Sequence, residues 1–364
     1  MPAEVSSPRD HVGRPTKGRR ELPHAGAGGR ATLHDVAARA GVSIGTVSNY
    51  LHGNVRVSPE TAERVRDAID DLGYVANAAA RTLKTGRTNN FTLAVSSLSQ
   101  PYFAELAEQV IAAADAHGCG VIVQSTGLSR SRIDKCIDMA KHGLTDGLII
   151  SPVLMGEGDA QLFAGNYPLA LLGTQPFDAP CPNITVDNVK ASYDATMHLI
   201  HAGRTRIAFV GGEFGPLRTS RTCRAQGYRM ALEDAGLPFD MRLVRPVYDW
   251  NSLEGALAVD ALLESVSDFD AVLACDDMLA LGVIRRLLDR GRGIPDDVRV
   301  IGMDDVDQSR YAVPTLSTVD LGKRAVAEEA VRSLIEQVDE KRRGEPSVRY
   351  VLHHLMLRES SPAL

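Results

Sequence analysis

The sequence predicts a small all-α helix-turn-helix head followed by an α/β core of two lobes, each built on a doubly wound parallel sheet. Residues 32–85 show helical periodicity with caps and turn glycines and no strand pattern. From residue 90 onward, apolar segments such as FTLAVS and RIAFVGG alternate with amphipathic helical segments, which is typical of parallel strands covered by helices on both faces. Because this series is too long for one average sheet, two βα series at about 90–187 and 188–318 predict two lobes.

The head is predicted to begin with a short helix. Thr32 and Asp35 have the spacing of a capping box at its start. Gly41 ends it, because glycine adopts the left-handed conformation that a tight turn needs. Its buried face is predicted to hold Val36, Ala37 and Ala40.

Two further helices complete the predicted head. Ser43 caps the second helix, and Ser58 with Pro59 opens the third. The apolar positions are Val47 and Leu51 in the second helix, and Val65, Ala68, Ile69 and Leu72 in the third. Two helices joined by a short turn can place the second in the DNA major groove. The alternative is a three-helix bundle that binds no nucleic acid.

The segment from Asn77 to Lys84 is a good helix former but is too short to be stable alone. We expect it to fold when two copies pack together on DNA, where a leucine can open a base step. In the free protein, a flexible linker is the alternative.

Charge is distributed unevenly along a chain whose net charge is −6. Residues 1–30 hold six basic against three acidic side chains, and residues 31–89 hold seven against six, so the remainder is strongly acidic. A mildly basic head on an acidic body is consistent with DNA binding, because the head attracts DNA phosphates and the body does not. Residues 1–30, rich in Pro, Gly, Arg and Ser, are predicted to be a disordered basic tail, and Gly13-Arg14-Pro15 within it is similar to minor-groove arms.

Several function classes lack support in the sequence. No apolar run approaches the ~20 residues that span a bilayer, and the N-terminal segment has no signal-peptide core, so we expect a cytoplasmic protein. The five cysteines are scattered without a CxxC pair, and no nucleophile–base set or metal motif is present. We therefore expect no cofactor, no metal and no catalysis. The loop Gly211-Gly212-Glu213-Phe214-Gly215 gives only a weak suggestion of a dinucleotide-binding enzyme.

The runs DVAARAGVSIGTVSNYLHG, VSPETAERVRDAIDDLGYVAN and AARTLKTGRT resemble the LacI/GalR-type transcriptional regulators. The resemblance implies that the second helix reads bases and that a hinge helix inserts a leucine into the minor groove. Many members have Arg where this chain has Asn49, and Asn pairs with adenine where Arg prefers guanine. Ala76 replaces a frequent proline before the hinge. The DNA-binding residues that we expect are Thr32, Ser43, Ile44, Gly45, Thr46, Ser48, Asn49, Asn77, Ala80 and Leu83.

The resemblance extends to the core, which in this family is similar to periplasmic sugar-binding proteins. It implies a ligand cleft between lobes that the chain joins three times, near Asp187–Asn188, Ser317–Leu321 and Glu340–Glu345. The segment RYVLHHLMLR is then the final strand of the second lobe. The expected divisions are a tail (1–30), a head (31–76), a hinge (77–89) and a core (90–364), with lobe 1 at about 90–187 and 321–343 and lobe 2 at about 188–318 and 346–360.

By position, the resemblance assigns eight residues to an effector site: Tyr102, Phe103, Arg218, Ser220, Arg224, Trp250, Asp276 and Asp304. Arg and Asp can bond sugar hydroxyls, and Trp can stack on a ring. Alternatives remain open: Tyr102 and Phe103 as core or dimer contacts, and Trp250 as a packing residue. We expect Asp277 to cap a helix that begins at Met278.

Together these features predict a ligand-responsive transcriptional regulator, a repressor that binds a palindromic operator in double-stranded DNA as a homodimer. A sugar or related metabolite is the expected effector, because Gly173-Thr174 replaces the Asp-Trp pair of purine-binding members. The alternative is a solute-binding receptor for a transporter, which the head and the missing signal peptide disfavour.

Overall fold

The computed structural model describes residues 31–52, 57–75, 82, 85–152, 155–175, 177–266 and 268–363. The chain divides into two compact units, Met1–Arg81 and Thr82–Leu364. The expected tail (1–30) and three of the expected DNA-binding residues, Asn77, Ala80 and Leu83, lie outside the described residues.

The head is a three-helix unit of α1 (Leu33–Ala40), α2 (Ile44–His52) and α3 (Pro59–Leu72). The predicted capping box is present: Thr32 Oγ1 accepts from the Asp35 amide at 3.3 Å, and the Thr32 amide donates to Asp35 Oδ2 at 2.8 Å. Gly41 ends α1 with φ of 65°. The small core contains Val36, Ala37, Ala40, Val47, Val65, Ala68 and Tyr74, so the predicted buried face of α1 is confirmed.

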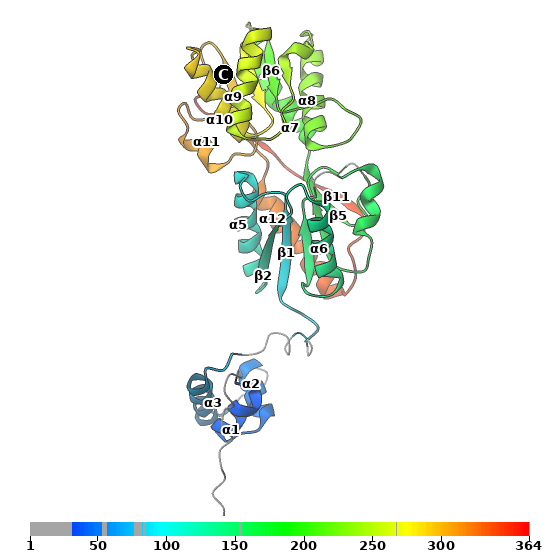
Figure 1. Ribbon diagram of the computed structural model, residues 1–364, viewed down its shortest axis with the longest axis vertical. Coiled ribbons are helices and arrows are strands. Elements are labelled where there is room, and N and C mark those ends of the chain that lie inside the picture. Colours follow the sequence, from blue (N-terminus) through cyan, green and yellow to red (C-terminus); the bar gives the residue numbers. More distant parts are fainter. Residues whose placement is uncertain are drawn as a thin grey trace, which may run out of the picture. The chain divides into compact units, whose positions relative to one another are not determined.

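The first lobe of the core is organised on a six-stranded parallel sheet of order β11-β5-β4-β3-β1-β2 (Figure 1). Its strands are β1 (Asn90–Val95), β2 (Gly120–Ser125), β3 (Gly147–Ile150), β4 (Leu169–Leu172), β5 (Pro182–Val186) and β11 (Ser347–Val351). Its helices are α5 (Pro101–Asp115), α6 (Arg130–Lys141), the 3₁₀ helix η1 (Glu157–Phe163) and α12 (Lys323–Glu340). Phe91, Leu93 and Val95 face one apolar cluster and Ala94 faces another, as a strand covered on both faces requires.

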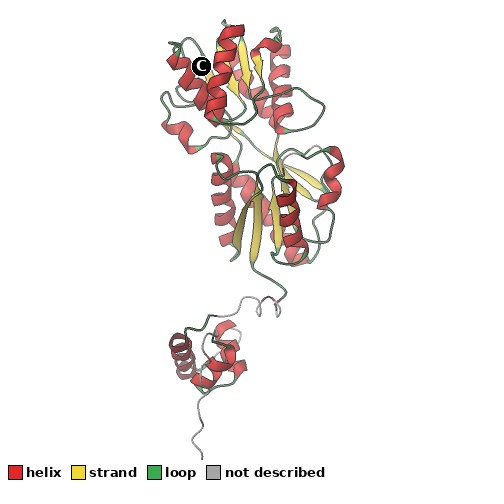
Figure 2. Cartoon of the chain, viewed as in Figure 1, coloured by secondary structure: helices red, strands yellow, loops and turns green. Residues whose placement is uncertain are grey.

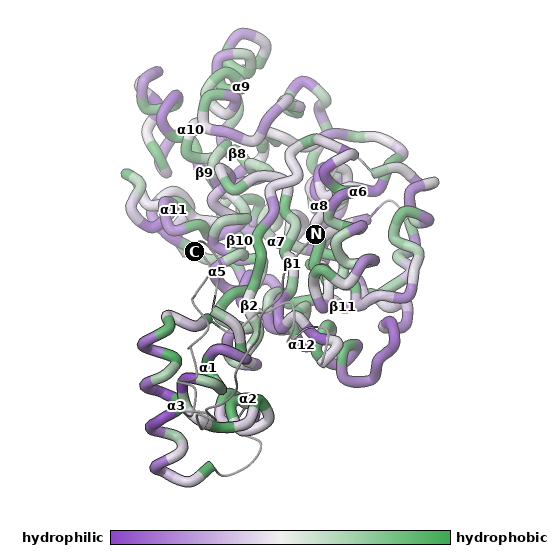
Figure 3. The backbone as a smooth tube through the Cα atoms, turned by 60° about the horizontal axis from the view of Figure 1, so that its bottom comes forward, coloured by the Kyte–Doolittle hydropathy of each residue, from purple (hydrophilic) through white to green (hydrophobic). Residues whose placement is uncertain are grey.

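The second lobe contains a four-stranded parallel sheet of order β7-β6-β8-β9 with one apolar core. Its strands are β6 (Ile207–Val210), β7 (Val244–Arg245), β8 (Ala271–Ala274) and β9 (Arg299–Ile301). Its helices are α7 (Asn188–His201), α8 (Ser220–Asp234), η2 (Met241–Leu243), α9 (Ser252–Ser265), α10 (Asp277–Asp289) and α11 (Asp307–Tyr311). Figure 2 shows helices flanking the strands in both lobes, and Figure 3 shows the hydrophobic residues along these strands.

The last strand differs from the prediction. The segment RYVLHHLMLR forms two strands: β11 lies beside β5 in the first sheet, and β12 (His354–Met356) pairs antiparallel with β10 (Thr318–Asp320). The third passage between the lobes is therefore at Leu352–His353, between these strands. The expected passage at Glu340–Glu345 was wrong, and so was the assignment of 346–351 to lobe 2, whereas residues 354–360 do lie with lobe 2. The apolar alternation of the segment could not show which sheet each half joins.

Among the described residues, no helix has both the length and the apolar composition to cross a bilayer.

Candidate functional site

The predicted base-reading residues lie at the start and along one side of α2. Ser43 Oγ accepts from the Thr46 amide at 3.1 Å and so caps this helix. Ser43, Ile44 and Gly45 are exposed, with Ile44 43% exposed, while Val47 faces the core. Thr46, Ser48 and Asn49 are partly exposed. A large apolar side chain in water at a helix start is available for contact with another molecule.

Gly45 is not required by packing within the head. A Cβ atom built there would meet only Ser43 Oγ, at 3.6 Å. Glycine weakens a helix interior relative to alanine, so the fold itself gives no reason for it. A missing side chain does let another backbone or a base edge approach α2 closely.

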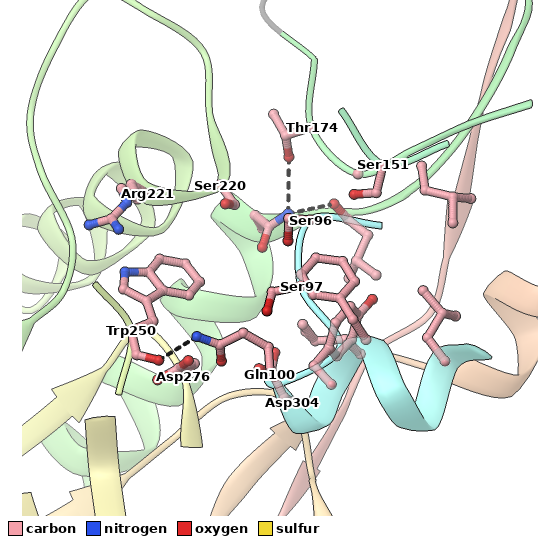
Figure 4. Close-up of a pocket in the computed structure, with 18 of the residues that line it drawn as sticks. Ser96, Ser97, Gln100, Ser151, Thr174, Ser220, Arg221, Trp250, Asp276 and Asp304 are labelled. Carbon is pink, nitrogen blue, oxygen red and sulfur yellow. Dashed lines mark hydrogen bonds between the residues drawn. The ribbon is translucent and has the colours of Figure 1, made fainter. Parts of the chain in front are cut away.

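A second candidate site is a cavity of about 600 Å³ in the core, lined by both lobes (Figure 4). Its residues follow the carboxyl ends of strands in both sheets, where open parallel sheets bind ligands. They include Ser96, Ser97, Gln100, Tyr102, Phe103, Leu128, Ser151 and Thr174 from the first lobe. The second lobe and the first passage between lobes contribute Asn188, Ser220, Arg221, Arg224, Asp249, Trp250, Asp276 and Asp304.

Seven of the eight predicted effector residues line this cavity, and Arg218 does not. Arg218 precedes Thr219, the N-cap of α8, and its guanidinium lies 3.5 Å from the hydroxyl of Tyr350 on β11. Ser220, the first residue of α8, does reach the cavity. The prediction that Arg218 lines the cavity was therefore wrong. The arginines that do line it, Arg221 and Arg224, lie after the N-cap of α8, whereas Arg218 lies before it.

Arg224 is the buried cation of the cavity, only 4% exposed. Its Nε donates to Asn188 Oδ1 at 2.8 Å, Nη1 donates to the carbonyl oxygen of Cys275, and Nη2 lies 4.0 Å from Asp304 Oδ1. Asn188 Nδ2 in turn donates to Thr174 Oγ1 of the first lobe at 3.1 Å. Since a buried guanidinium needs such partners, this network fixes Arg224 between the lobes.

Asp276, not Asp277, caps α10. Its carboxylate accepts from the Leu279 amide at 2.8 Å. The Asp277 side chain is buried and accepts from the Val306 amide at 3.0 Å, from Ser309 Oγ at 2.7 Å and from Thr318 Oγ1. The expected helix start was thus one residue late. Two adjacent aspartates offer the same capping chemistry, so the sequence did not distinguish them.

Burial dominates the electrostatics of the carboxyl groups. It raises the pKa of Asp276 to about 6 and that of Asp277 to about 7. Burial also raises the pKa of Asp304 well above its usual range; Arg224 opposes this effect and the neighbouring Asp276 adds to it. Asp276 and Asp304 line the cavity, so a ligand that donates hydrogen bonds would stabilise these two poorly solvated carboxylates.

Trp250 is held by contacts from both lobes. Its carbonyl oxygen accepts from Gln100 Nε2 at 2.6 Å (Figure 4). The guanidinium carbons of Arg221 and Arg224 lie 4.8 Å and 5.2 Å from its ring centroid. Cation–π contacts of this kind stabilise the ring orientation.

Arg221 was not predicted from the sequence. Its guanidinium donates to the carbonyl oxygens of Gly211 at 3.3 Å, Val247 at 2.9 Å and Tyr248 at 3.2 Å. These bonds occupy it within the second lobe. The sequence did contain a signal for Arg221. It lies three residues before Arg224, which was already assigned to the cavity, and residues three apart lie on the same face of a helix. Asn188 could similarly have been found, because it is one of the two polar side chains that directly follow β5.

Tyr102 and Phe103 form part of the first-lobe wall. Their rings meet edge to face, with centroids 5.2 Å apart. Both also pack against apolar clusters of the core, so the structural role and the lining role coexist. Within the described part of the chain, no cluster of His, Cys, Asp or Glu could hold a metal ion.

Two family models match the chain. Residues 32–77 match "Bacterial regulatory proteins, lacI family", and residues 196–361 match "Periplasmic binding protein-like domain". The transcriptional regulator CelR of Thermobifida fusca is 34% identical over 349 residues, which cover 91% of this chain and 98% of that protein.

Solved structures agree with these matches. A CelR–cellobiose complex has a TM-score of 0.67 and 32% identity, covering 91% of this chain and 100% of that one. A lac repressor dimer bound to operator and the anti-inducer ONPF has a TM-score of 0.80, covering 92% of this chain and 100% of that one. At 24% identity, the latter similarity shows the fold.

Proposed function

This chain belongs to the LacI family of bacterial regulatory proteins, and we propose that it is a repressor whose operator binding is controlled by a sugar in the core cavity. The observation that carries this proposal is the combination, in one chain, of a capped helix-turn-helix head and a cavity that polar and apolar side chains of both lobes line. The chain is a DNA-binding transcriptional regulator, and its relatives suggest no catalytic step for the cavity. It acts in the cytoplasm, where its operator lies.

Operator recognition is assigned to α2. Asn49 can bond adenine through two hydrogen bonds, and Ile44 can contact a thymine methyl group. Gly45 allows close approach, and Thr32, Ser43, Thr46 and Ser48 contribute to placing the head on the duplex. The hinge residues Asn77, Ala80 and Leu83 are assigned to the minor groove on the family resemblance alone.

A homodimer is proposed because a lac repressor of the same fold is a dimer on its operator. The second lobe has apolar side chains that such a contact could cover. Tyr248, Leu253, Tyr311 and Val313 are exposed large apolar side chains. Such side chains in water are typical of an interaction surface when they gather in a patch. A dimer would present two heads to a two-fold symmetric operator.

The proposed effector is a neutral sugar, and cellobiose is the first compound to test because a CelR complex contains it. The cavity lining holds two cations, Arg221 and Arg224, and three carboxylates, Asp249, Asp276 and Asp304, so it offers no excess of positive charge to an anionic ligand. The poorly solvated carboxylates of Asp276 and Asp304 would accept hydrogen bonds from hydroxyl groups. A cavity of about 600 Å³ has room for a disaccharide.

Selection of random duplex DNA by the full-length chain tests the DNA-binding part. We expect the selected sequences to converge on an inverted repeat, with affinity that falls as salt rises. A selection that returns no two-fold sequence would contradict the proposal. Thermal-shift screening of neutral, acidic and phosphorylated sugars tests the cavity, since a bound ligand raises the melting temperature. Stabilisation by sugar phosphates alone would contradict a neutral effector.

A further inference from the structure

The loop that carries Asp304 is held by two side chains from the opposite lobe. Lys323, at the start of α12, donates from Nζ to the carbonyl oxygens of Asp304 and Asp305, the latter at 3.0 Å. Glu105 of α5 accepts from the Asp307 amide at 2.9 Å, and its other oxygen lies 3.3 Å from Lys323 Nζ. Helices α5 and α12 pack in the first lobe, whereas this loop follows β9 of the second. The two side chains therefore bridge the lobes.

The bridged loop has an unfavourable backbone conformation. Asp304 has φ of 121° and Asp305 has φ of 47°, a region that residues other than glycine rarely adopt. Such conformations persist only where the surroundings fix them. On its own lobe, the loop is held by Arg310 and Arg358 through the Asp305 carboxylate. The Asp304 amide also donates to the Val319 carbonyl oxygen, and the Asp305 amide donates to Thr318 Oγ1. Lys323 adds a restraint from the other lobe, at the carbonyl oxygens of Asp304 and Asp305.

Asp304 joins the bridge to the cavity. Its carboxylate lines the cavity, while its carbonyl oxygen bonds Lys323. Neither Glu105 nor Lys323 lines the cavity, but Lys323 Nζ lies 5.9 Å from the ring centroid of Tyr102, which does. The side chains of Lys323 and Glu105 are 11% and 30% exposed, so their attraction is less screened than that of a surface pair.

We propose that Glu105 and Lys323 form an interlobe latch that holds the lobes together and positions the Asp304 carboxylate for the ligand. They are positioning residues that act through the loop. Opening of the lobes breaks their bonds to Asp304, Asp305 and Asp307, so the orientation of the cavity carboxylate depends on closure. The ligand-binding consequence rests on the proposed function, whereas the latch itself does not.

Hydrogen exchange of the unliganded full-length chain tests the latch without any ligand. Lys323→Met and Glu105→Ala are each expected to speed amide exchange about tenfold or more in residues 304–309, and also in the first turn of α5, because charge-assisted hydrogen bonds are lost on both sides. Since the pair acts as a unit, the double variant should add little to the larger single effect. Arg324→Met and Glu108→Ala, exposed neighbours on the same helices, are the matched controls.

Three results would overturn the latch: unchanged exchange in both variants, equal effects in the controls, or faster exchange that extends to β1 and β8. The last would indicate general destabilisation. Titration with cellobiose then tests positioning, and both latch variants are expected to bind it at least several-fold more weakly than the wild type. Equal affinities would overturn positioning. Failure of the wild type to bind any sugar would instead contradict the proposed function, while the exchange result still decides the latch.

Discussion

Replacing Asp276 by asparagine should stabilise the protein more at pH 8 than at pH 4. Burial raises the pKa of Asp276 from 3.8 to about 6. A carboxyl with a raised folded-state pKa opposes folding when it is charged. This cost is fully present above about pH 6 and disappears as the pH falls below 3.8. Asparagine carries no charge, and it remains a good N-cap for the Leu279 amide.

The size of the effect follows from the shift in pKa. About two units correspond to roughly 3 kcal/mol in the free energy of unfolding, at about 1.4 kcal/mol per unit. The difference between variant and wild type should therefore grow by up to about this amount between pH 4 and pH 8. Urea unfolding of the full-length chain, followed by circular dichroism at both pH values, measures it.

Asp187→Asn is the matched control. Asp187 caps α7 in the same way, accepting from the Lys190 amide at 3.0 Å, but it is exposed. Its replacement should shift the unfolding midpoint similarly at both pH values. If Asp276→Asn gains no more at pH 8 than at pH 4, the Asp276 carboxylate is well solvated and the argument for a poorly hydrated cavity wall is refuted.

Three further outcomes are expected. Trp250 is the only tryptophan and lines the cavity, so a sugar bound there should change the intrinsic fluorescence. A sugar that causes no thermal shift should leave the fluorescence unchanged. A sugar that raises the melting temperature without changing the fluorescence would bind elsewhere. Asn49→Ala should weaken binding to the selected operator by about 1–3 kcal/mol in a fluorescence anisotropy titration, with little change in affinity for random DNA. An equal loss of affinity for both DNAs would show that Asn49 does not read a base. Gly227→Ala should lower the melting temperature, because the added Cβ would lie 2.0 Å from the Val189 carbonyl oxygen and overpacking costs about 1–3 kcal/mol. Gly45→Ala should not lower it, because the Cβ there would meet only Ser43 Oγ, at 3.6 Å. Equal melting temperatures for the two variants would contradict the close packing of α7 on α8.

The head was predictable because its signals are local. Thr32 with Asp35, Gly41, and Ser58 with Pro59 each specify a helix end within four residues of sequence, and all are found where the pattern placed them. The parallel sheets were predictable for a similar reason, since a strand buried on both faces must be continuously apolar.

The errors arose where neighbouring residues offer equivalent chemistry. Asp276 and Asp277 can both cap α10, and only the packing of Ser309 and Thr318 around Asp277 decides between them. Arg218 and Arg221 lie on either side of the N-cap of α8, so a shift of the helix start changes which one faces the cavity. The latch was out of reach, because Glu105 and Lys323 are far apart in sequence and meet only through the folding of both lobes.

The central claim is that the cavity and the operator-binding head are coupled, and linkage measures it most directly. The affinity of the full-length chain for its selected operator should be determined with and without a saturating sugar that raises the melting temperature. The affinity for that sugar should be determined with and without operator. We predict that both affinities change in the same direction and by the same factor, as thermodynamic reciprocity requires. A sugar that binds tightly and leaves operator affinity unchanged would contradict it.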